Sequence, residues 1–159
     1  MEPRSFITTE QSRENPAFGK LATPDEAEVT LEKEGIIGVA FQATWKPSLA
    51  NDARAALFVD GVQLSLPNAL EDALQEAGGQ HDSEDEWGSL FTTGEGLQSR
   101  SPGSGFTPAA TGQIIGFKEL GGGPVYIPAA AGAHIITVEF RAVSGLVAVK
   151  NRKLVIWSH

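Results

Sequence analysis

The chain has no cysteine, which excludes disulfide bridges, thiolate metal sites and cysteine nucleophiles. It also has no run of about 18 apolar residues, the length a membrane-spanning helix needs. Basic residues are scarce, since 12 Lys and Arg stand against 20 Asp and Glu and leave a net charge of −8. Phosphate binding requires a concentrated basic face, so we expect no nucleic-acid partner and no membrane partner.

Glycine and proline are abundant, with 18 and 9 residues in a chain of 159. Such a composition is typical of a chain that reverses direction often, and the length is that of one domain. The first residues, Met1-Glu-Pro-Arg-Ser, lack the basic-then-apolar form of a signal peptide. We therefore expect a single domain rich in turns and short strands, made without a signal peptide.

Residues 1–25 differ in composition from the rest of the chain. This segment is polar and proline-containing, and its apolar side chains are isolated, so it cannot bury a core of its own. Two interpretations remain open: a disordered tail, or an extended N-terminal arm that docks on a neighbouring subunit or a larger assembly. Its candidate anchors are Phe6, Ile7, Phe18 and Leu21.

Residues 26–159 show the alternation of β-strands. Five apolar residues at every second position between Ile37 and Trp45 predict a long core strand. Asp60-Gly61 joins two alternating runs and predicts a β-hairpin. The stretch from His134 to Trp157 predicts further strands, with a hairpin turn at Ser144-Gly145 and a reversal or a bulge at Asn151-Arg152.

Only residues 68–79 have helix-like spacing, which predicts at most one short helix in a crossing loop. Residues 81–86 form an acidic stretch that lacks the glycine and the distant glutamate of a calcium loop, so we expect a solvated loop. With eight to ten strands expected by count of these signals, the fold class is all-β. We predict an antiparallel two-sheet jelly-roll sandwich over residues 26–159, preceded by the extended arm.

No constellation of catalytic residues is recognisable. The three histidines, His81, His134 and His159, have no zinc-ligand spacing, and the chain has no G-x-S-x-G elbow. We therefore predict no catalytic residue, no metal site and no cofactor. Trp87, beside the acidic stretch, is the best candidate for a surface tryptophan that stacks on a sugar ring. The cluster of Lys150, Arg152 and Lys153 is expected to be a solvated turn.

Three segments carry a resemblance to a known class. They are Gly-Val-Ala-Phe-Gln-Ala-Thr-Trp at 38–45, Ala-Ala-Leu-Phe-Val-Asp-Gly-Val-Gln-Leu at 55–64, and Ala-Gly-Ala-His-Ile-Ile-Thr-Val-Glu-Phe at 131–140. Their order after a polar arm resembles the trimeric jelly rolls of the tumour-necrosis-factor and C1q-like class. More narrowly, it is similar to small virion proteins of tailed bacteriophages. The resemblance covers residues 26–157 and is one of pattern.

The resemblance implies a structural virion protein that is not an enzyme. Its expected form is a homotrimeric capsid decoration protein on the head surface, made in the host cytoplasm, that docks through its arm on the major capsid protein or a tail protein. The alternative is a tail or fibre tip, or a carbohydrate-binding head that recognises a cell-surface glycan, with Trp87 as the glycan contact. Candidate residues for the trimer axis are Phe41, Phe58, Tyr126 and Phe140.

Overall fold

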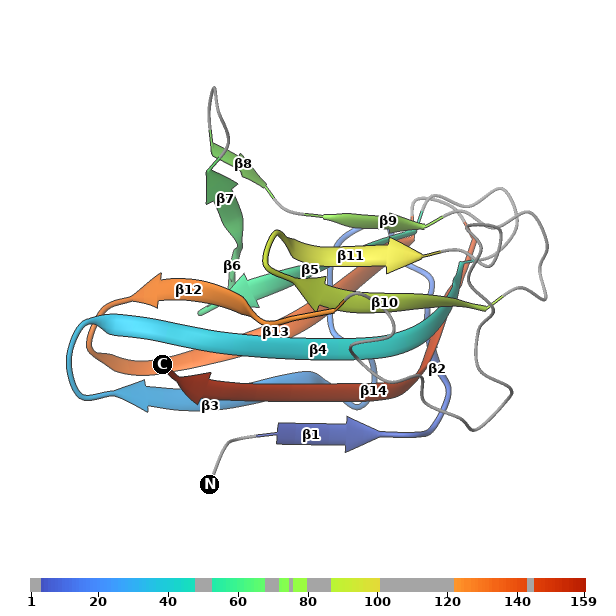
Figure 1. Ribbon diagram of the computed structural model, residues 1–159. Coiled ribbons are helices and arrows are strands. Elements are labelled where there is room, and N and C mark those ends of the chain that lie inside the picture. The colour runs from blue at the N-terminus through green and yellow to red at the C-terminus, as the bar shows by residue number, and fades with distance from the viewer. Residues whose placement is uncertain are drawn as a thin grey trace.

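The structure, a computed structural model, describes residues 4–47, 53–67, 72–74, 76–79, 87–100, 122–142 and 145–159 (Figure 1). The regular structure of these residues is entirely β. Two antiparallel sheets pack against each other as a sandwich, which confirms the predicted all-β class. The described part of the chain contains no helix that could cross a membrane.

The larger sheet has seven strands and contains both ends of the described chain. Its order is β1-β14-β4-β10-β11, with β12 also paired to β4 and β2 also paired to β14. These strands are β1 (Arg4–Ile7), β2 (Gln11–Arg13), β4 (Gly35–Pro47), β10 (Gly88–Thr93), β11 (Gly96–Arg100), β12 (Val125–Ala129) and β14 (Val147–Ser158). Every pairing is antiparallel.

The second sheet has five strands in the order β3-β13-β5-β6, with β9 also paired to β5. They are β3 (Asp25–Leu31), β5 (Ala53–Val59), β6 (Val62–Gln63), β9 (Ala77–Gly79) and β13 (Gly132–Ala142). Two more strands, β7 (Ser65–Pro67) and β8 (Asp72–Leu74), pair only with each other and project from the sandwich (Figure 1). The Ser99 hydroxyl donates to the Gly78 carbonyl, which ties β11 of the larger sheet to β9 of the smaller one.

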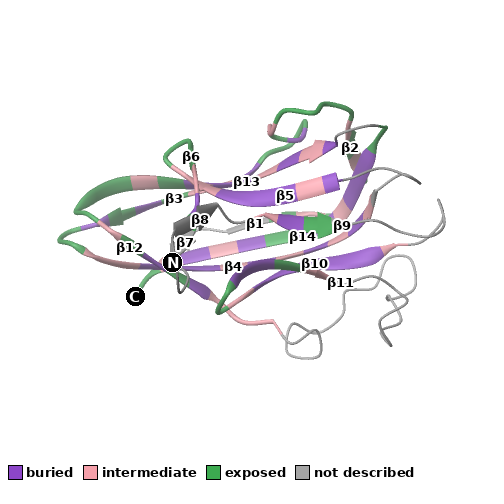
Figure 2. Cartoon of the chain, turned by 90° about the horizontal axis from the view of Figure 1, so that it is seen from above, coloured by how far each residue is buried: buried purple, intermediate pink, exposed green. Residues whose placement is uncertain are grey.

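The core lies between the two sheets. All five apolar residues predicted for one face of the long strand, from Ile37 to Trp45, are buried, which confirms that prediction. They belong to one core cluster with Ile136, Val138 and Phe140 of β13 in the other sheet, which are fully buried. Figure 2 shows the buried residues gathered along the strands that face each other across the two layers. Burial of each such side chain stabilises the fold by about 1.5–3 kcal/mol.

The predicted hairpin at Asp60-Gly61 is confirmed. Both residues have positive φ, 52° and 82°, as a type I′ turn requires, and Val59 pairs with Val62 across the turn. Asp60 also holds the neighbouring strand, because its Oδ1 accepts a hydrogen bond of 2.8 Å from the Ile135 amide.

Two local predictions are wrong. Within residues 68–79 the described part forms β8 and β9 and no helix. β9 consists of the small residues Ala77, Gly78 and Gly79, and its pairing with β5 outweighs the weak helical spacing of the sequence. The prediction of a hairpin at Ser144-Gly145 is also wrong, because β13 and β14 belong to different sheets and do not pair; Ser144 itself lies outside the described residues. Asn151-Arg152 is a β-bulge, marked by a register shift between Lys150 and Lys153.

Candidate functional site

The N-terminal segment lies along the sandwich of its own chain. β1 pairs with β14 from Arg4 opposite Val155 to Ile7 opposite Arg152, and β2 pairs with the other half of β14. Phe6 is 54% exposed and Ile7 is half-buried. The first half of the predicted arm is therefore the edge of the seven-stranded sheet.

The second half of the predicted arm contributes to packing. Leu21 is buried in the core between the sheets. Phe18 lies on the outer face of the five-stranded sheet, edge-to-face with Phe58 at 5.5 Å and with the Arg141 guanidinium 5.0 Å from its ring centre. These two anchors contact their own chain, and Phe6 is the candidate anchor that remains exposed.

A buried ion pair fastens this segment to the last strand. Arg152 is 0% exposed, and its Nη1 donates to Asp25 Oδ2 at 2.6 Å and to the Thr23 carbonyl at 2.9 Å. Its Nη2 donates to Gln11 Oε1 at 2.8 Å, and the same oxygen accepts from the Thr23 amide at 2.9 Å. One guanidinium thus joins β2, the segment before β3, and β14.

The bulge explains why an arginine lies inside. Asn151 has a φ of +51°, a left-handed conformation that asparagine tolerates, and the extra residue turns Arg152 toward the interior. The expected solvated cluster of Lys150, Arg152 and Lys153 is therefore wrong for Arg152. Burial raises the pKa of Asp25 to about 6, against the lowering effect of the Arg152 charge and hydrogen bond.

The four candidate trimer-axis residues lie in three different environments. Phe41 and Phe140 are 1% and 0% exposed inside the intrachain core, so they have no surface to offer a neighbouring subunit. Phe58 is half-buried under Phe18. Tyr126 is 46% exposed on the outer face of the seven-stranded sheet, where it contacts Trp157 edge-to-face at 6.4 Å and His159 at 4.6 Å. Of the four, Tyr126 alone remains a surface candidate.

Trp87, the candidate glycan contact, is half-buried one residue before β10. Its indole lies under two ammonium groups: Lys150 Nζ is 4.0 Å and Lys46 Nζ 4.8 Å from the ring centre. Sequence reasoning missed both lysines, because they lie on β14 and β4 and only the pairing of these strands brings them to the indole.

His134 lies between two acceptors. Its Nδ1 is 2.7 Å from Asp60 Oδ2 and its Nε2 is 2.7 Å from the Ala130 carbonyl. Both oxygens accept, so the protonated imidazolium satisfies both contacts, and the Ala130 carbonyl and Asp60 raise the pKa of His134. The Ile135 amide and His134 in turn lower the pKa of Asp60. His81 lies outside the described residues.

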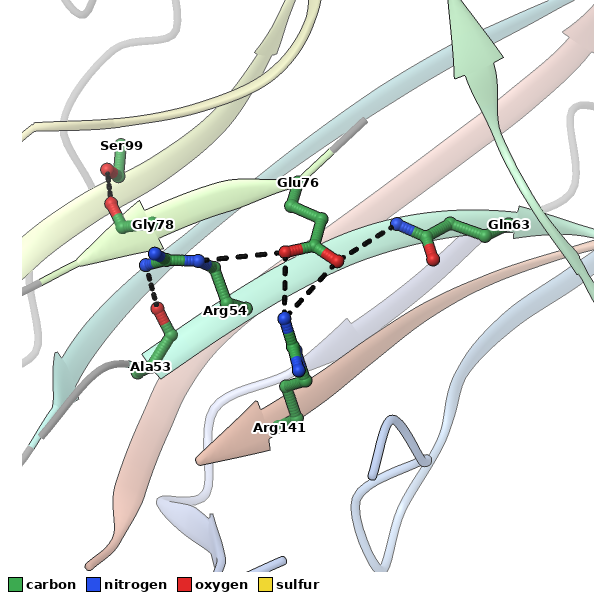
Figure 3. A network of polar contacts seen from close by, with 7 residues as sticks. All are labelled: Ala53, Arg54, Gln63, Glu76, Gly78, Ser99 and Arg141. Carbon is green, nitrogen blue, oxygen red and sulfur yellow. Dashed lines mark hydrogen bonds and ion pairs between the residues drawn. The ribbon is translucent and has the colours of Figure 1, made fainter. Parts of the chain in front are cut away.

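The outer face of the five-stranded sheet carries a polar network centred on Glu76 (Figure 3). Arg141 Nη2 donates to both of its carboxylate oxygens at 3.1 and 3.4 Å, Arg54 Nε lies 3.6 Å away, and Gln63 Nε2 donates at 3.4 Å. The donors come from β5, β6 and β13, and Glu76 directly precedes β9, so the network holds these four strands together. Among the described residues no group of three or more His, Asp or Glu side chains is placed to hold a metal.

Comparison of the chain with models of known protein families gives no match, and comparison with curated proteins gives none either.

Proposed function

We propose that the protein is a structural virion protein, a homotrimeric capsid decoration protein that docks on its particle through its N-terminal segment. The observation that carries the proposal is the position of β1. It is the edge strand of the seven-stranded sheet, with β14 on one side and no described strand on the other, and it exposes the aromatic ring of Phe6. An edge strand of this kind is a template for pairing with another chain.

The strand order gives further support. From β3 to β5, and again from β12 to β14, successive strands alternate between the two sheets. Such crossing is what a jelly roll requires, and it agrees with the resemblance to trimeric jelly-roll proteins. The strand order does not depend on any single residue, so it supports the jelly-roll class but does not identify the protein on which the chain docks.

Docking is tested with Phe6→Ser, which removes the exposed ring and leaves the β1 backbone in place. The parent protein is expected to co-sediment with purified particles of the phage concerned, and the variant to lose most of this association. Val62→Ser is the matched control, because Val62 is 69% exposed at the far hairpin and belongs to no proposed contact. Equal association of Phe6→Ser and the parent protein would remove the docking role.

The trimer is tested by mass in solution. Three chains of 16.8 kDa give about 50 kDa, which sedimentation equilibrium separates clearly from a monomer. Tyr126→Lys places a charge at the one axis candidate that is exposed and is expected to shift the mass toward 16.8 kDa. A parent protein that is monomeric at micromolar concentration contradicts the trimer.

A second candidate function is a carbohydrate-binding head at a tail or fibre tip. It is favoured by one specific observation, the half-buried Trp87 with two lysine side chains over its ring. The part of the half-buried indole that stays exposed provides an apolar surface for a sugar ring, and the two lysines over the ring provide polar contacts.

A further inference from the structure

The outer face of the seven-stranded sheet differs in charge from the rest of this acidic protein. Lys46 and Lys150 lie over Trp87. Lys153 of β14 lies further along the same face, opposite Gln42 of β4. No Asp or Glu occupies a described strand position on this face, although the whole chain has 20 of them. The described strand positions of this face therefore carry positive charge and no negative charge, in a molecule of net charge −8.

Among the described residues none of the three lysines, Lys46, Lys150 and Lys153, forms an ion pair with an acidic side chain. Lys46 and Lys150 instead converge on one indole, which brings two like charges to neighbouring strands. Like charges on neighbouring strands repel each other, and an anion bound between them would remove this repulsion. Lys46 and Lys150 are thus placed to bind a negatively charged group between them.

An open groove continues the face away from Trp87. It has a volume of about 130 Å³ and is lined by Ala40, Phe41, Gln42, Lys153 and Val155. Its floor is apolar and its edge is polar, the combination that suits a sugar ring, which has an apolar C–H face and a rim of hydroxyl groups. From Ala40 to Lys46 the strand rises about 20 Å, so one extended chain of several sugars can span the groove and the lysine pair.

We propose that this face binds an anionic carbohydrate, a glycan that carries carboxylate or sulfate groups. Lys46 and Lys150 contact one acidic group beside Trp87, and Lys153 contacts a second at the groove. Lysine suits this ligand, because an ammonium group is a compact charge that can donate hydrogen bonds to an anion from many directions. A nucleic acid is less suited, since its closely spaced phosphates need more cations than three and the remaining surface repels a long polyanion. The inference rests on the second candidate function and is independent of the trimer.

The test measures binding of an oligogalacturonate by titration calorimetry, with a neutral malto-oligosaccharide of equal length as the comparison. The parent protein is expected to bind the acidic sugar, with an affinity that falls as salt is added. The double variant Lys46→Gln/Lys150→Gln should lose about tenfold or more in affinity, whereas Lys46→Arg/Lys150→Arg retains the charge and most of the binding. Lys33→Gln is the matched control, because Lys33 is exposed in the loop between β3 and β4, away from this face.

Each other outcome decides against the proposal in a distinct way. Binding of the neutral sugar alone overturns the anionic ligand and leaves a carbohydrate-binding head. Binding of neither sugar by the parent protein contradicts both the anionic ligand and the carbohydrate-binding head. Tighter binding of single-stranded DNA than of oligogalacturonate reassigns the face to nucleic acid. None of these outcomes changes the mass or the particle association that test the virion role.

Discussion

At the scale of single residues, the positions that matter most are the ones that break the pattern of their strand. Asn151 takes a left-handed conformation in the middle of β14, and in consequence Arg152 lies inside with Asp25. Two buried charged groups in one small domain need each other, because either alone would be an ionised group without a partner away from water. The pair therefore specifies where the N-terminal segment lies more than it adds to stability.

Replacement of Arg152 by methionine is expected to lower the free energy of unfolding by about 3–5 kcal/mol, since it leaves the Asp25 carboxyl buried without its partner. Urea unfolding followed by tryptophan fluorescence measures the change. Lys153→Met, at the exposed neighbouring position, is the control and should change stability by about 0.5 kcal/mol or less. A loss no larger than that of the control would show that Arg152 is dispensable.

Asp25 also predicts a pH dependence. Its pKa rises from 3.8 to about 6 on folding, so between these pH values the native protein holds a proton that the unfolded chain has released. The stability that this proton confers is present below pH 3.8 and is lost as the pH rises through about 6, by up to about 3 kcal/mol. The difference in unfolding free energy between the parent protein and Asp25→Asn should therefore shift against the parent over this range. A difference that stays constant from pH 4 to pH 7 contradicts the assignment, because a shift of about 2 kcal/mol is expected over that range.

At the scale of elements, strong alternation was a reliable guide and weak spacing was not. The strand from Ile37 to Trp45 alternates without a break, and it is found as the centre of β4. The helical spacing within 68–79 depended on few apolar residues, and pairing of Ala77–Gly79 with β5 replaced it by a strand. Propensity over so short a segment is worth little beside the hydrogen bonds and packing of an available strand edge.

The N-terminal segment is predicted to consist of two parts with different effects on stability. Deletion of residues 1–7 removes β1 and should leave a cooperatively unfolding domain. Deletion of residues 1–25 removes Leu21 from the core and all the partners of Arg152, losses of about 2–5 and 3–5 kcal/mol. Their sum is a large share of the stability of an ordinary domain, about 5–15 kcal/mol, so this truncation should not fold. Thermal unfolding by circular dichroism distinguishes the two, and a stable, cooperative 26–159 fragment would contradict the division.

At the scale of the whole molecule, the two ends of the chain meet in one sheet. β1 pairs with β14, and β14 pairs with β4, so contacts between distant residues close the fold. We expect refolding in milliseconds to seconds, the range typical of β-sandwiches whose strands pair mostly with strands distant in the sequence. Stopped-flow fluorescence of the fully buried Trp45 follows it. Refolding complete within about a hundred microseconds would contradict closure by these distant pairings.

The sequence by itself determined the class of structure and the buried face of the long strand from Ile37 to Trp45. Alternation decides these locally, because successive side chains of a strand point to opposite sides whatever the strand pairs with. It also determined the hairpin at Asp60-Gly61, where positive φ at two positions is a property of the residues themselves. Of the isolated apolar residues in the first 25, which the sequence predicts to dock on another subunit, Leu21 and Phe18 pack against their own chain.

Only the tertiary structure decided which strands are neighbours. The crossing between β13 and β14, the burial of Arg152 beside Asp25 and the meeting of Lys46 and Lys150 over Trp87 all join residues from separate strands. Such pairings depend on the free energy of the whole sandwich and on the entropy of closing long loops, to which every strand contributes. No local pattern records them, and for this reason both candidate surfaces of this protein became visible only in three dimensions.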